Sequence, residues 1–348
     1  MVKIENDEKL DFNQVLIKPK RSFINSRKDV NILRKIKFRN NYTWEGVPII
    51  AANMNAVGTF EIYKELSKHK MITAFHKFYV LEDYQEFKKT NMLNPDYFMV
   101  SSGIREGDYE KLCNIVDNID VNFINLDVPN GYIPNFVNFC KRVRERYPNK
   151  IISAGNVATS DMVESLIMEA DVDIIKAGIG GGSVCTTRKV TGVGVPQLSC
   201  IMECSDAAHG LNRYIIGDGG ITCPGDLAKA LCGGADFVMM GGSLAGHTEN
   251  PGELIEKDVN GKKEQFKVFY GMSSMHAMKV HYEKDHKYRA GEGKVVEIKY
   301  KGPIENTIRE YLGGIRSTCT YIGAENIKHM NKCTTFILVK QQLNNVFS

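Results

Sequence analysis

The chain has 348 residues, of which 43% are hydrophobic and 9% aromatic, as expected of a globular protein with a large core. Its 45 basic and 41 acidic residues leave a net charge of +4, which argues against nucleic acid as a partner but suits a small anionic ligand. The start of the chain is charged and no apolar run approaches membrane-spanning length, so neither a secretory leader nor a membrane partner is expected.

Short apolar runs recur along most of the chain at intervals of about 23 to 28 residues, and helical patterns lie between them. The predicted strands are 47–51, 71–75, 97–100, 121–126, 150–154, 172–177, 213–216 and 236–240. The predicted helices are 59–69, 108–116, 132–147, 160–169, 197–209 and 223–231, with a closing helix at 304–312. Alternating strands and helices indicate an α/β protein with a parallel sheet, and eight units are the number that closes a (β/α)8 TIM barrel.

Each predicted strand ends in polar residues or glycine. In a (β/α)8 barrel these eight exits lie on one face, which carries the chemistry. An open doubly wound sheet, the alternative, would gather such residues at one switch point instead. We therefore expect one catalytic barrel domain that spans residues 1–348.

Two segments interrupt the repeat. A long loop at 178–196 follows the sixth strand, and an insertion of about 60 residues, 243–303, follows the eighth. The insertion holds a predicted hairpin turn at 258–262. Long loops at the active face of a barrel are typically lids, so the insertion is predicted to be one.

The loop after the sixth strand combines glycines with one cysteine, Cys185. Glycines at 178 and 180–182 expose backbone groups that can hold an anion or a cation. The hydroxyls of Thr186 and Thr187 and the positive charge of Arg188 favour a thiolate. The segment is therefore predicted to carry a nucleophile, and the alternative is a flexible surface loop. The nine cysteines show no zinc spacing, which is typical of reduced thiols in the cytoplasm.

Glycine pairs follow the seventh and eighth strands, at 217–220 and at Gly241-Gly242. This is the usual phosphate-binding location of the barrel fold, and close backbone packing is the alternative. Asp218 would repel a phosphate and is better placed to hydrogen-bond a ribose hydroxyl pair. Glu292, in the insertion, is either a general acid or base or a solvated surface charge.

Five motifs together resemble the GMP reductase family, a sibling of IMP dehydrogenase with the same barrel fold. They are 182–188 (GSVCTTR), 217–220 (GDGG), 222–226 (TCPGD), 271–274 (GMSS) and 316–321 (RSTCTY). Asp11-Phe12 and residues 19–22 (PKRS) also match. The resemblance implies that GMP and NADPH react to give IMP, ammonia and NADP⁺. It also implies that Cys185 attacks the purine carbon that carries the amino group, giving a covalent thioimidate, with Thr187 and Glu292 as the proton relay.

The resemblance also implies binding residues. Those for GMP are Asp218, Gly219, Gly220, Gly241, Gly242, Gly271, Met272, Ser273, Arg289, Ala290, Gly291 and Gly293. Those for NADPH are Lys77, Asp127, Val128, Pro129, Ile179, Gly180, Tyr288 and Arg289, with Ser26, Arg27, Ser317, Thr318, Cys319 and Thr320 from a neighbouring subunit. The family is usually a homotetramer and binds a monovalent cation, K⁺, which would lie at Gly180, Gly182, Cys185 and Arg188, mainly on backbone carbonyls.

The chain departs from the family pattern at three places. Gly181 replaces a proline, which should loosen the cysteine loop, Asn55-Ala56 replaces Asp-Thr, and Pro129 replaces an alanine. None of these changes removes a group with a direct chemical role.

Three other functions are weighed against the reductase. An IMP dehydrogenase would usually insert paired cystathionine-synthase-type (CBS) repeats after the second strand, where there is no room, and its Arg-Tyr pair is reversed here at Tyr288-Arg289. A catalytically silent nucleotide-binding barrel would not need Cys185. An aldolase or isomerase would need a Schiff-base lysine, for which Lys77 and Lys176 are candidates.

Overall fold

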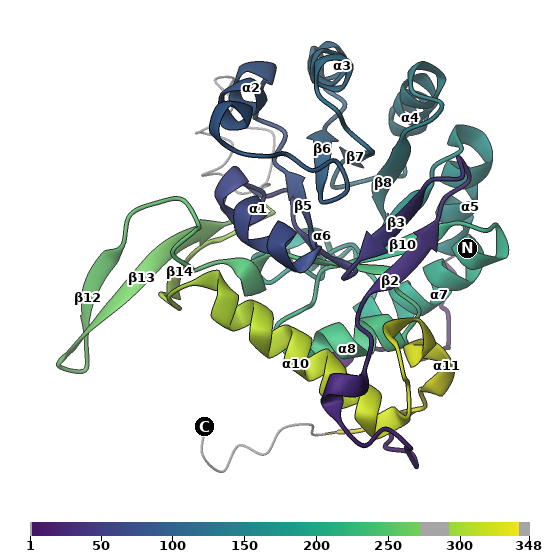
Figure 1. Ribbon diagram of the computed structural model, residues 1–348. Coiled ribbons are helices and arrows are strands. Elements are labelled where there is room, and N and C mark those ends of the chain that lie inside the picture. Colours follow the sequence, from purple (N-terminus) through teal and green to yellow (C-terminus); the bar gives the residue numbers. More distant parts are fainter. Residues whose placement is uncertain (1, 272–291, 341–348) are drawn as a thin grey trace.

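The computed structural model describes residues 2–271 and 292–340. Eight parallel strands close into a barrel in the order β10–β11–β4–β5–β6–β7–β8–β9, which confirms the predicted (β/α)8 architecture (Figure 1). The strands are β4 (Ile49–Ala51), β5 (Ile72–Phe75), β6 (Phe98–Ser102), β7 (Phe123–Asp127), β8 (Ile151–Val157), β9 (Ile174–Ala177), β10 (Tyr214–Asp218) and β11 (Phe237–Met240). Within the described ranges, no helix has the length and apolar character needed to cross a membrane.

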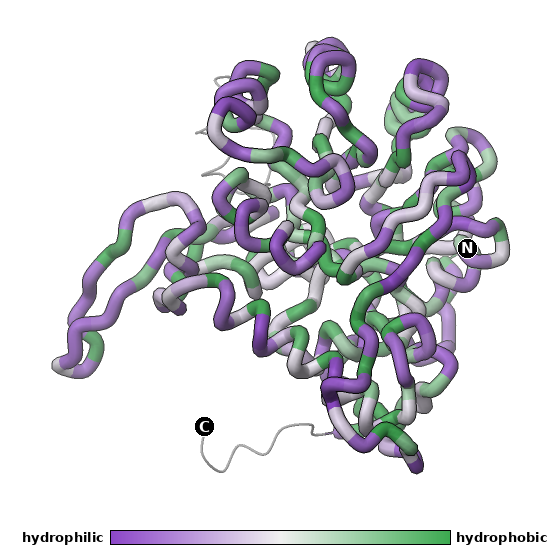
Figure 2. Tube along the Cα trace, in the orientation of Figure 1, coloured by the Kyte–Doolittle hydropathy of each residue, from purple (hydrophilic) through white to green (hydrophobic). Residues whose placement is uncertain are grey.

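Helices cover the outside of the barrel. They are α1 (Phe60–Leu66), α2 (Leu81–Thr90), α3 (Asp108–Asn118), α4 (Pro134–Arg146), α5 (Ser160–Ala170), α7 (Gln197–Gly210), α8 (Pro224–Cys232) and α10 (Ile304–Ile322). Figure 2 shows hydrophilic residues on the outer turns of α2, α3 and α4 and hydrophobic ones on their inner sides. This pattern is typical of amphipathic helices that pack on a sheet.

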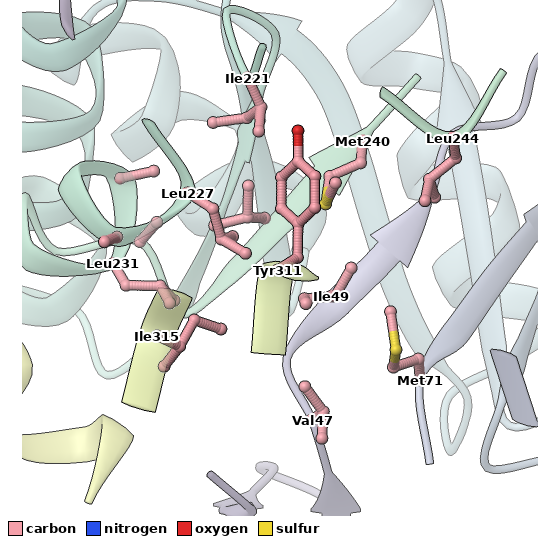
Figure 3. Packing of buried hydrophobic residues seen from close by; sticks show 14 of the residues in the cluster. Val47, Ile49, Met71, Ile221, Leu227, Leu231, Met240, Leu244, Tyr311 and Ile315 are labelled. Carbon is pink, nitrogen blue, oxygen red and sulfur yellow. The ribbon is translucent and has the colours of Figure 1, made fainter. Parts of the chain in front are cut away.

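The closing helix, α10, continues to Ile322, well beyond the predicted end at residue 312. Its buried residues include Ile308, Tyr311, Ile315 and Cys319, which recur every three or four positions and therefore share one face. Figure 3 shows Tyr311 and Ile315 beside the apolar side chains of α8 and the barrel strands. This apolar face explains why the helix runs on.

A short antiparallel hairpin, β2 (Arg34–Lys37) and β3 (Thr43–Gly46), plugs the end of the barrel opposite the strand exits. Its Ile36 and Trp44 are buried in one cluster with residues from the beginnings of the barrel strands. Trp44 packs on Phe237, with the ring centroids 5.0 Å apart. The hairpin fills the barrel interior at this end, which leaves the opposite end for a site.

Two aspartates brace the same end of the barrel in the same way. Asp173 accepts a hydrogen bond from the backbone N–H of Ile152 at 2.9 Å, and Asp236 accepts one from Ile215 at 2.9 Å. Each aspartate therefore ties the beginning of its own strand to the strand before it. The arginines that pair with these two carboxylates are Arg144 and Arg34, respectively.

The insertion at 243–303 contains more regular structure than a loop. Strands β12 (Ile255–Val259), β13 (Lys262–Tyr270) and β14 (Val295–Lys299) form an antiparallel sheet that projects from the barrel (Figure 1). The predicted hairpin turn lies between β12 and β13, where Asn260 and Gly261 adopt positive φ angles of 54° and 78°. Residues 272–291 of the predicted lid lie outside the described residues.

The two ends of the described chain meet in a two-stranded sheet. β1 (Val15–Ile17) pairs antiparallel with β15 (Phe336–Leu338). The backbone N–H of Val339 also donates to the carbonyl of Gln14 at 3.0 Å. The chain termini therefore fasten each other beside the barrel.

The pH dependence of stability gives a test of the bracing at Asp236. His209 Nε2 lies 2.8 Å from Asp236 Oδ2, and this hydrogen bond raises the pKa of His209, although burial opposes the shift. A raised pKa in the folded state stabilises the fold below the ordinary value, and this contribution is lost as the pH rises through the raised value. We expect His209→Gln to lower the free energy of unfolding more at about pH 6 than at about pH 9, as measured by urea denaturation.

The control is His329→Gln, because His329 contacts only an asparagine among its printed partners and lies on the exposed surface. Its cost in stability should not depend on pH in this way. An equal cost of His209→Gln at both pH values would contradict the assignment.

Candidate active site

A pocket of about 340 Å³ opens at the carboxyl ends of the barrel strands. This is where a (β/α)8 barrel carries its chemistry, because the strand exits supply side chains from many segments. Sixteen of the residues selected from the sequence line it: Lys77, Asp127, Val128, Pro129, Ile179, Gly180, Gly182, Cys185, Thr187, Asp218, Gly219, Gly220, Gly241, Gly242, Gly271 and Glu292.

The cysteine loop is joined to the far end of the insertion by backbone pairing. Cys185 and Gly293 form an antiparallel bridge, and the N–H of Thr186 donates to the carbonyl of Glu292 at 2.9 Å. On the other side of the bridge, the N–H of Lys294 donates to the carbonyl of Val184 at 3.0 Å. The bridge fixes the register of the two segments and so brings Glu292 to the cysteine.

Three side chains form a chain of hydrogen bonds at this bridge. The half-buried Cys185 donates from Sγ to Thr187 Oγ1 at 3.2 Å, and Thr187 Oγ1 donates to Glu292 Oε2 at 2.7 Å. Thr187 begins α6 (Thr187–Thr191), so its side chain is held by a helical turn directly after the cysteine. A thiol, a hydroxyl and a carboxylate in this order can hold a nucleophile and move a proton to or from a group bound to it.

Glycines after β10 and β11 leave the backbone open to the pocket. Gly219 and Gly220 have φ angles of 108° and 79°, which side chains rarely adopt, and a Cβ on Gly219 would lie 3.2 Å from the backbone of Gly181. Gly242 begins a 3-10 helix, and a Cβ there would lie 2.4 Å from Ser183 Oγ. Exposed N–H groups at two neighbouring strand exits can hold a phosphate.

A buried lysine lies beneath the pocket. Lys176, on β9, is 1% exposed, and its ammonium pairs with Asp127 and lies 3.7 Å from Asp218 Oδ2. Burial alone would lower the pKa of Lys176, but the two carboxylates outweigh it and raise the pKa. A Schiff-base lysine needs the opposite shift, so this geometry argues against the aldolase alternative for Lys176.

The two carboxylates have further partners. Asp218 accepts from Asn156 Nδ2 at 2.8 Å, and the same amide group donates to the carbonyl of Gly178 at 2.8 Å. Burial would raise the pKa of Asp127, but the ammonium of Lys176, with help from Lys77, holds the pKa below its ordinary value. Both aspartates are therefore anchored hydrogen-bond acceptors at the pocket floor.

The pocket is positively charged on the side of β5 and β6. Lys77 and Arg105 line it there, next to Val128, Pro129 and Ile179. Two cations beside apolar and proline side chains can hold the phosphates and the ring of a dinucleotide. Sequence reasoning selected Lys77 and missed Arg105.

Arg188 holds the cysteine loop from behind. Its Nη1 donates to Asp11 Oδ2 at 2.8 Å, and its Nη2 donates to the carbonyl of Val195 at 2.6 Å. The guanidinium therefore joins the loop to the N-terminal segment. Gly293 lies in the bridge to Cys185 and, like Arg188, is not among the residues that line the pocket.

The remaining residues selected from the sequence lie elsewhere. Met272, Ser273, Tyr288, Arg289, Ala290 and Gly291 are outside the described residues. Ser26 and Arg27 lie next to α10, because Arg316 donates to the carbonyls of Arg27 and Val30. This second surface, away from the pocket lining, holds Ser26, Arg27, Ser317, Thr318 and Thr320, whereas the side chain of Cys319 is buried in the core.

The donor set of the loop bears on the predicted cation. In the part of the chain that the structure describes, no group of three or more His, Cys, Asp or Glu side chains could hold a metal ion. The loop offers backbone carbonyls instead, and that of Gly182 already accepts the N–H of Cys185 at 3.0 Å. Such neutral oxygens suit a weakly bound monovalent cation better than a divalent one.

Sequence reasoning missed two central residues, Asn156 and Lys176. Asn156 follows a glycine at a predicted strand exit, which was a usable signal. Lys176 is the one charged residue at the end of the apolar run 172–177, and it was considered only as an amine nucleophile. The signal for a buried ion pair was present, but its partners could not be identified without the fold.

Comparison with known proteins gives full-length matches. Residues 9–344 match the family model described as IMP dehydrogenase / GMP reductase domain. The chain is 56% identical over 350 residues to human GMP reductase 2, covering 100% of this chain and 99% of the relative. It is 53% identical to mouse GMP reductase 1, covering 100% of each, and 53% identical to GMP reductase of Photobacterium profundum, covering 99% of each.

The contact between two strand exits can be tested by a glycine substitution. Gly178 has a φ of 150°, and an added Cβ would lie 2.0 Å from the backbone carbonyl of Asp218. Because backbone cannot yield as a side chain does, we expect Gly178→Ala to lower the free energy of unfolding by more than about 2 kcal/mol, measured by urea denaturation.

The matched control is Gly210→Ala, at the end of α7, where nothing lies within 4 Å of the added Cβ. This variant should change stability by less than about 1 kcal/mol. Equal effects of the two substitutions would show that the contact does not constrain the site.

Proposed function

This chain belongs to the IMP dehydrogenase / GMP reductase family and reduces GMP to IMP, and we propose that it does so through a covalent intermediate on Cys185. The observation that carries the proposal is the hydrogen-bonded series Cys185–Thr187–Glu292, set in a pocket with backbone groups for a phosphate. A nucleophile alone would suit many reactions. A nucleophile with a proton relay suits the displacement of an amino group.

In the proposed reaction, the sulfur of Cys185 attacks the purine carbon that bears the amino group. The C–N bond breaks, and the amino group leaves as ammonia after it takes a proton from the Glu292 carboxyl through the hydroxyl of Thr187. The chemistry that NADPH supplies when bound is hydride transfer to the same carbon, which is thereby reduced by two electrons. The C–S bond then breaks, so that IMP leaves and the thiolate is restored.

The pocket divides between the two reactants. The nucleotide half contains Asp218 and the glycines after β10 and β11, which would hold the ribose hydroxyls and the phosphate of GMP. The residues that would complete this half are Gly219, Gly220, Gly241, Gly242, Gly271, Met272, Ser273, Arg289, Ala290, Gly291 and Gly293. The cofactor half would hold NADPH, whose use the family implies, with Lys77, Asp127, Val128, Pro129, Ile179, Gly180, Tyr288 and Arg289.

The second surface, with Ser26, Arg27, Ser317, Thr318 and Thr320, fits the proposal if the protein is a homotetramer. Its residues are away from the pocket of their own chain, so they would contact a cofactor only in a neighbouring subunit. The cofactor site would then lie at the subunit interface. The exposed side chain of Arg27 is suited to a cofactor phosphate.

A monovalent cation, K⁺, is proposed to bind the carbonyls of Gly180, Gly182 and Cys185. The loop offers neutral oxygens and no acidic cluster, which suits such an ion. Arg188 would contribute only its backbone, because its guanidinium is engaged by Asp11 and Val195. The ion would order the loop that carries the nucleophile.

We propose a single catalytic domain that acts in the cytoplasm. All nine cysteines are free, which is expected in a reducing compartment. The described chain forms one barrel with the sheet β12–β14 and the β1–β15 pair attached to it.

Replacing the nucleophile separates chemistry from binding. We expect Cys185→Ala to abolish the oxidation of NADPH in the presence of GMP, followed by nicotinamide absorbance, because no covalent intermediate can form. GMP binding by calorimetry should persist, since the phosphate and ribose contacts come from other residues. Full activity of this variant would refute the covalent mechanism.

The reaction itself has an independent control. The unaltered protein should show no reduction of NAD⁺ in the presence of IMP under conditions where it oxidises NADPH with GMP. Turnover in the first mixture alone would mean that the chain works as a dehydrogenase.

The relay can be tested by removing one proton-carrying group at a time. Thr187→Val and Glu292→Gln should each lower kcat by about 10²- to 10⁴-fold, with less effect on GMP affinity. Thr187→Ser keeps the hydroxyl and should retain most of the activity, as measured in the same absorbance assay. If Thr187→Val is as active as Thr187→Ser, the hydroxyl is not part of the relay.

A further inference from the structure

The floor of the pocket carries an ion cluster that the proposed chemistry does not use. Lys176 points from β9 into the barrel, and its ammonium pairs with Asp127 at the end of β7 and lies near Asp218 at the end of β10. Its side chain is 1% exposed, whereas those of Asp127 and Asp218 are 29% and 23% exposed. One buried cation therefore serves two carboxylates that reach the pocket.

The two carboxylates belong to different halves of the pocket. Asp218 lies in the nucleotide half, with Gly219 and Gly220, and Asp127 lies in the cofactor half, with Val128 and Pro129. Without a shared cation, these two negative charges would face each other across a partly buried space. Repulsion between like charges at short range costs far more there than in water.

We propose that Lys176 is a positioning residue for the reaction, and that its ammonium keeps Asp127 and Asp218 charged and oriented so that both halves of the pocket form together. The inference rests on the proposed function, because it assigns GMP to Asp218. Lys176 touches neither reactant in this proposal and acts through the two aspartates.

The other groups around the cluster support this role. Asn156 holds Asp218 from β8 with an uncharged amide at 2.8 Å, and Asn53 donates a hydrogen bond to Asp127. Lys77 adds a second positive charge near Asp127. Near Asp218, in contrast, the ammonium of Lys176 is the cation that the structure places within ion-pair distance among the described residues.

This difference makes a sharp expectation for charge removal. Without Lys176, Asp127 keeps Lys77, whereas Asp218 loses its cation and faces the negative Asp127. The nucleotide half should therefore suffer most. Removing the charge of Asp127 as well should relieve the repulsion and restore the nucleotide half.

The test is a double-mutant cycle with GMP binding measured by calorimetry, which does not depend on turnover. Lys176→Met is expected to weaken GMP binding by about tenfold or more, since a charge-assisted contact of Asp218 is lost. The double variant Lys176→Met/Asp127→Asn is expected to bind GMP more tightly than Lys176→Met does. Lys176→Arg, which keeps the charge, should lose less affinity than Lys176→Met.

A merely structural lysine would not give this pattern. The control is Lys267→Met, because Lys267 is also buried but its ammonium donates to the carbonyls of Thr248 and Asn250, away from both aspartates. This variant should lose thermal stability without a change in GMP affinity. If Lys176→Met does not fold, the double variant, which has no unpaired carboxylate at Asp127, is compared with Asp127→Asn.

Two results would overturn the inference. One is a Lys176→Met variant that binds GMP as the unaltered protein does. The other is a double variant in which the two losses simply add, or, in the comparison with Asp127→Asn, a double variant that loses about tenfold or more in GMP affinity. Failure of the proposed function would look different, because the unaltered protein would then bind GMP without oxidising NADPH.

Discussion

The active site depends on the backbone bridge between the cysteine loop and the strand that follows the insertion. Residues 184–186 pair with residues 292–294, and this pairing alone places Glu292 within 2.7 Å of Thr187. Backbone hydrogen bonds specify register, and a shift by one residue would turn the carboxylate to the other side. The chemistry of the pocket is therefore set by main-chain geometry before any side chain makes a contact.

The two ends of the barrel use different physical means. At the end plugged by β2 and β3, charge is buried and fully paired: Asp173 and Asp236 each join an arginine to a backbone N–H of a neighbouring strand. At the open end, glycine exits leave backbone groups unoccupied for a ligand. Lys176 is the exception, because it brings a paired charge to the open end, directly under the reactants.

Much of this fold was predictable from the sequence, because strand and helix periods alternate eight times. Cys185 was predictable too, since glycines and hydroxyls surround it. The hairpin of β2 and β3 was not, because Arg34–Lys37 holds one apolar residue and no strand pattern. The role of Glu292 came only from family resemblance, since a contact across 105 residues leaves no local signal. The same holds for Lys176, whose partners lie on other strands.

The separation of Thr187 and Glu292 along the chain also has a temporal consequence. A ribosome adds about 5 to 20 residues each second, so the thiol leaves the ribosome roughly 5 to 20 s before the carboxylate that serves it. The first strand likewise waits for β15, its partner at the other end of the chain. A nascent polypeptide thus carries an unassembled nucleophile through most of its synthesis, and it becomes an enzyme only when translation is almost complete.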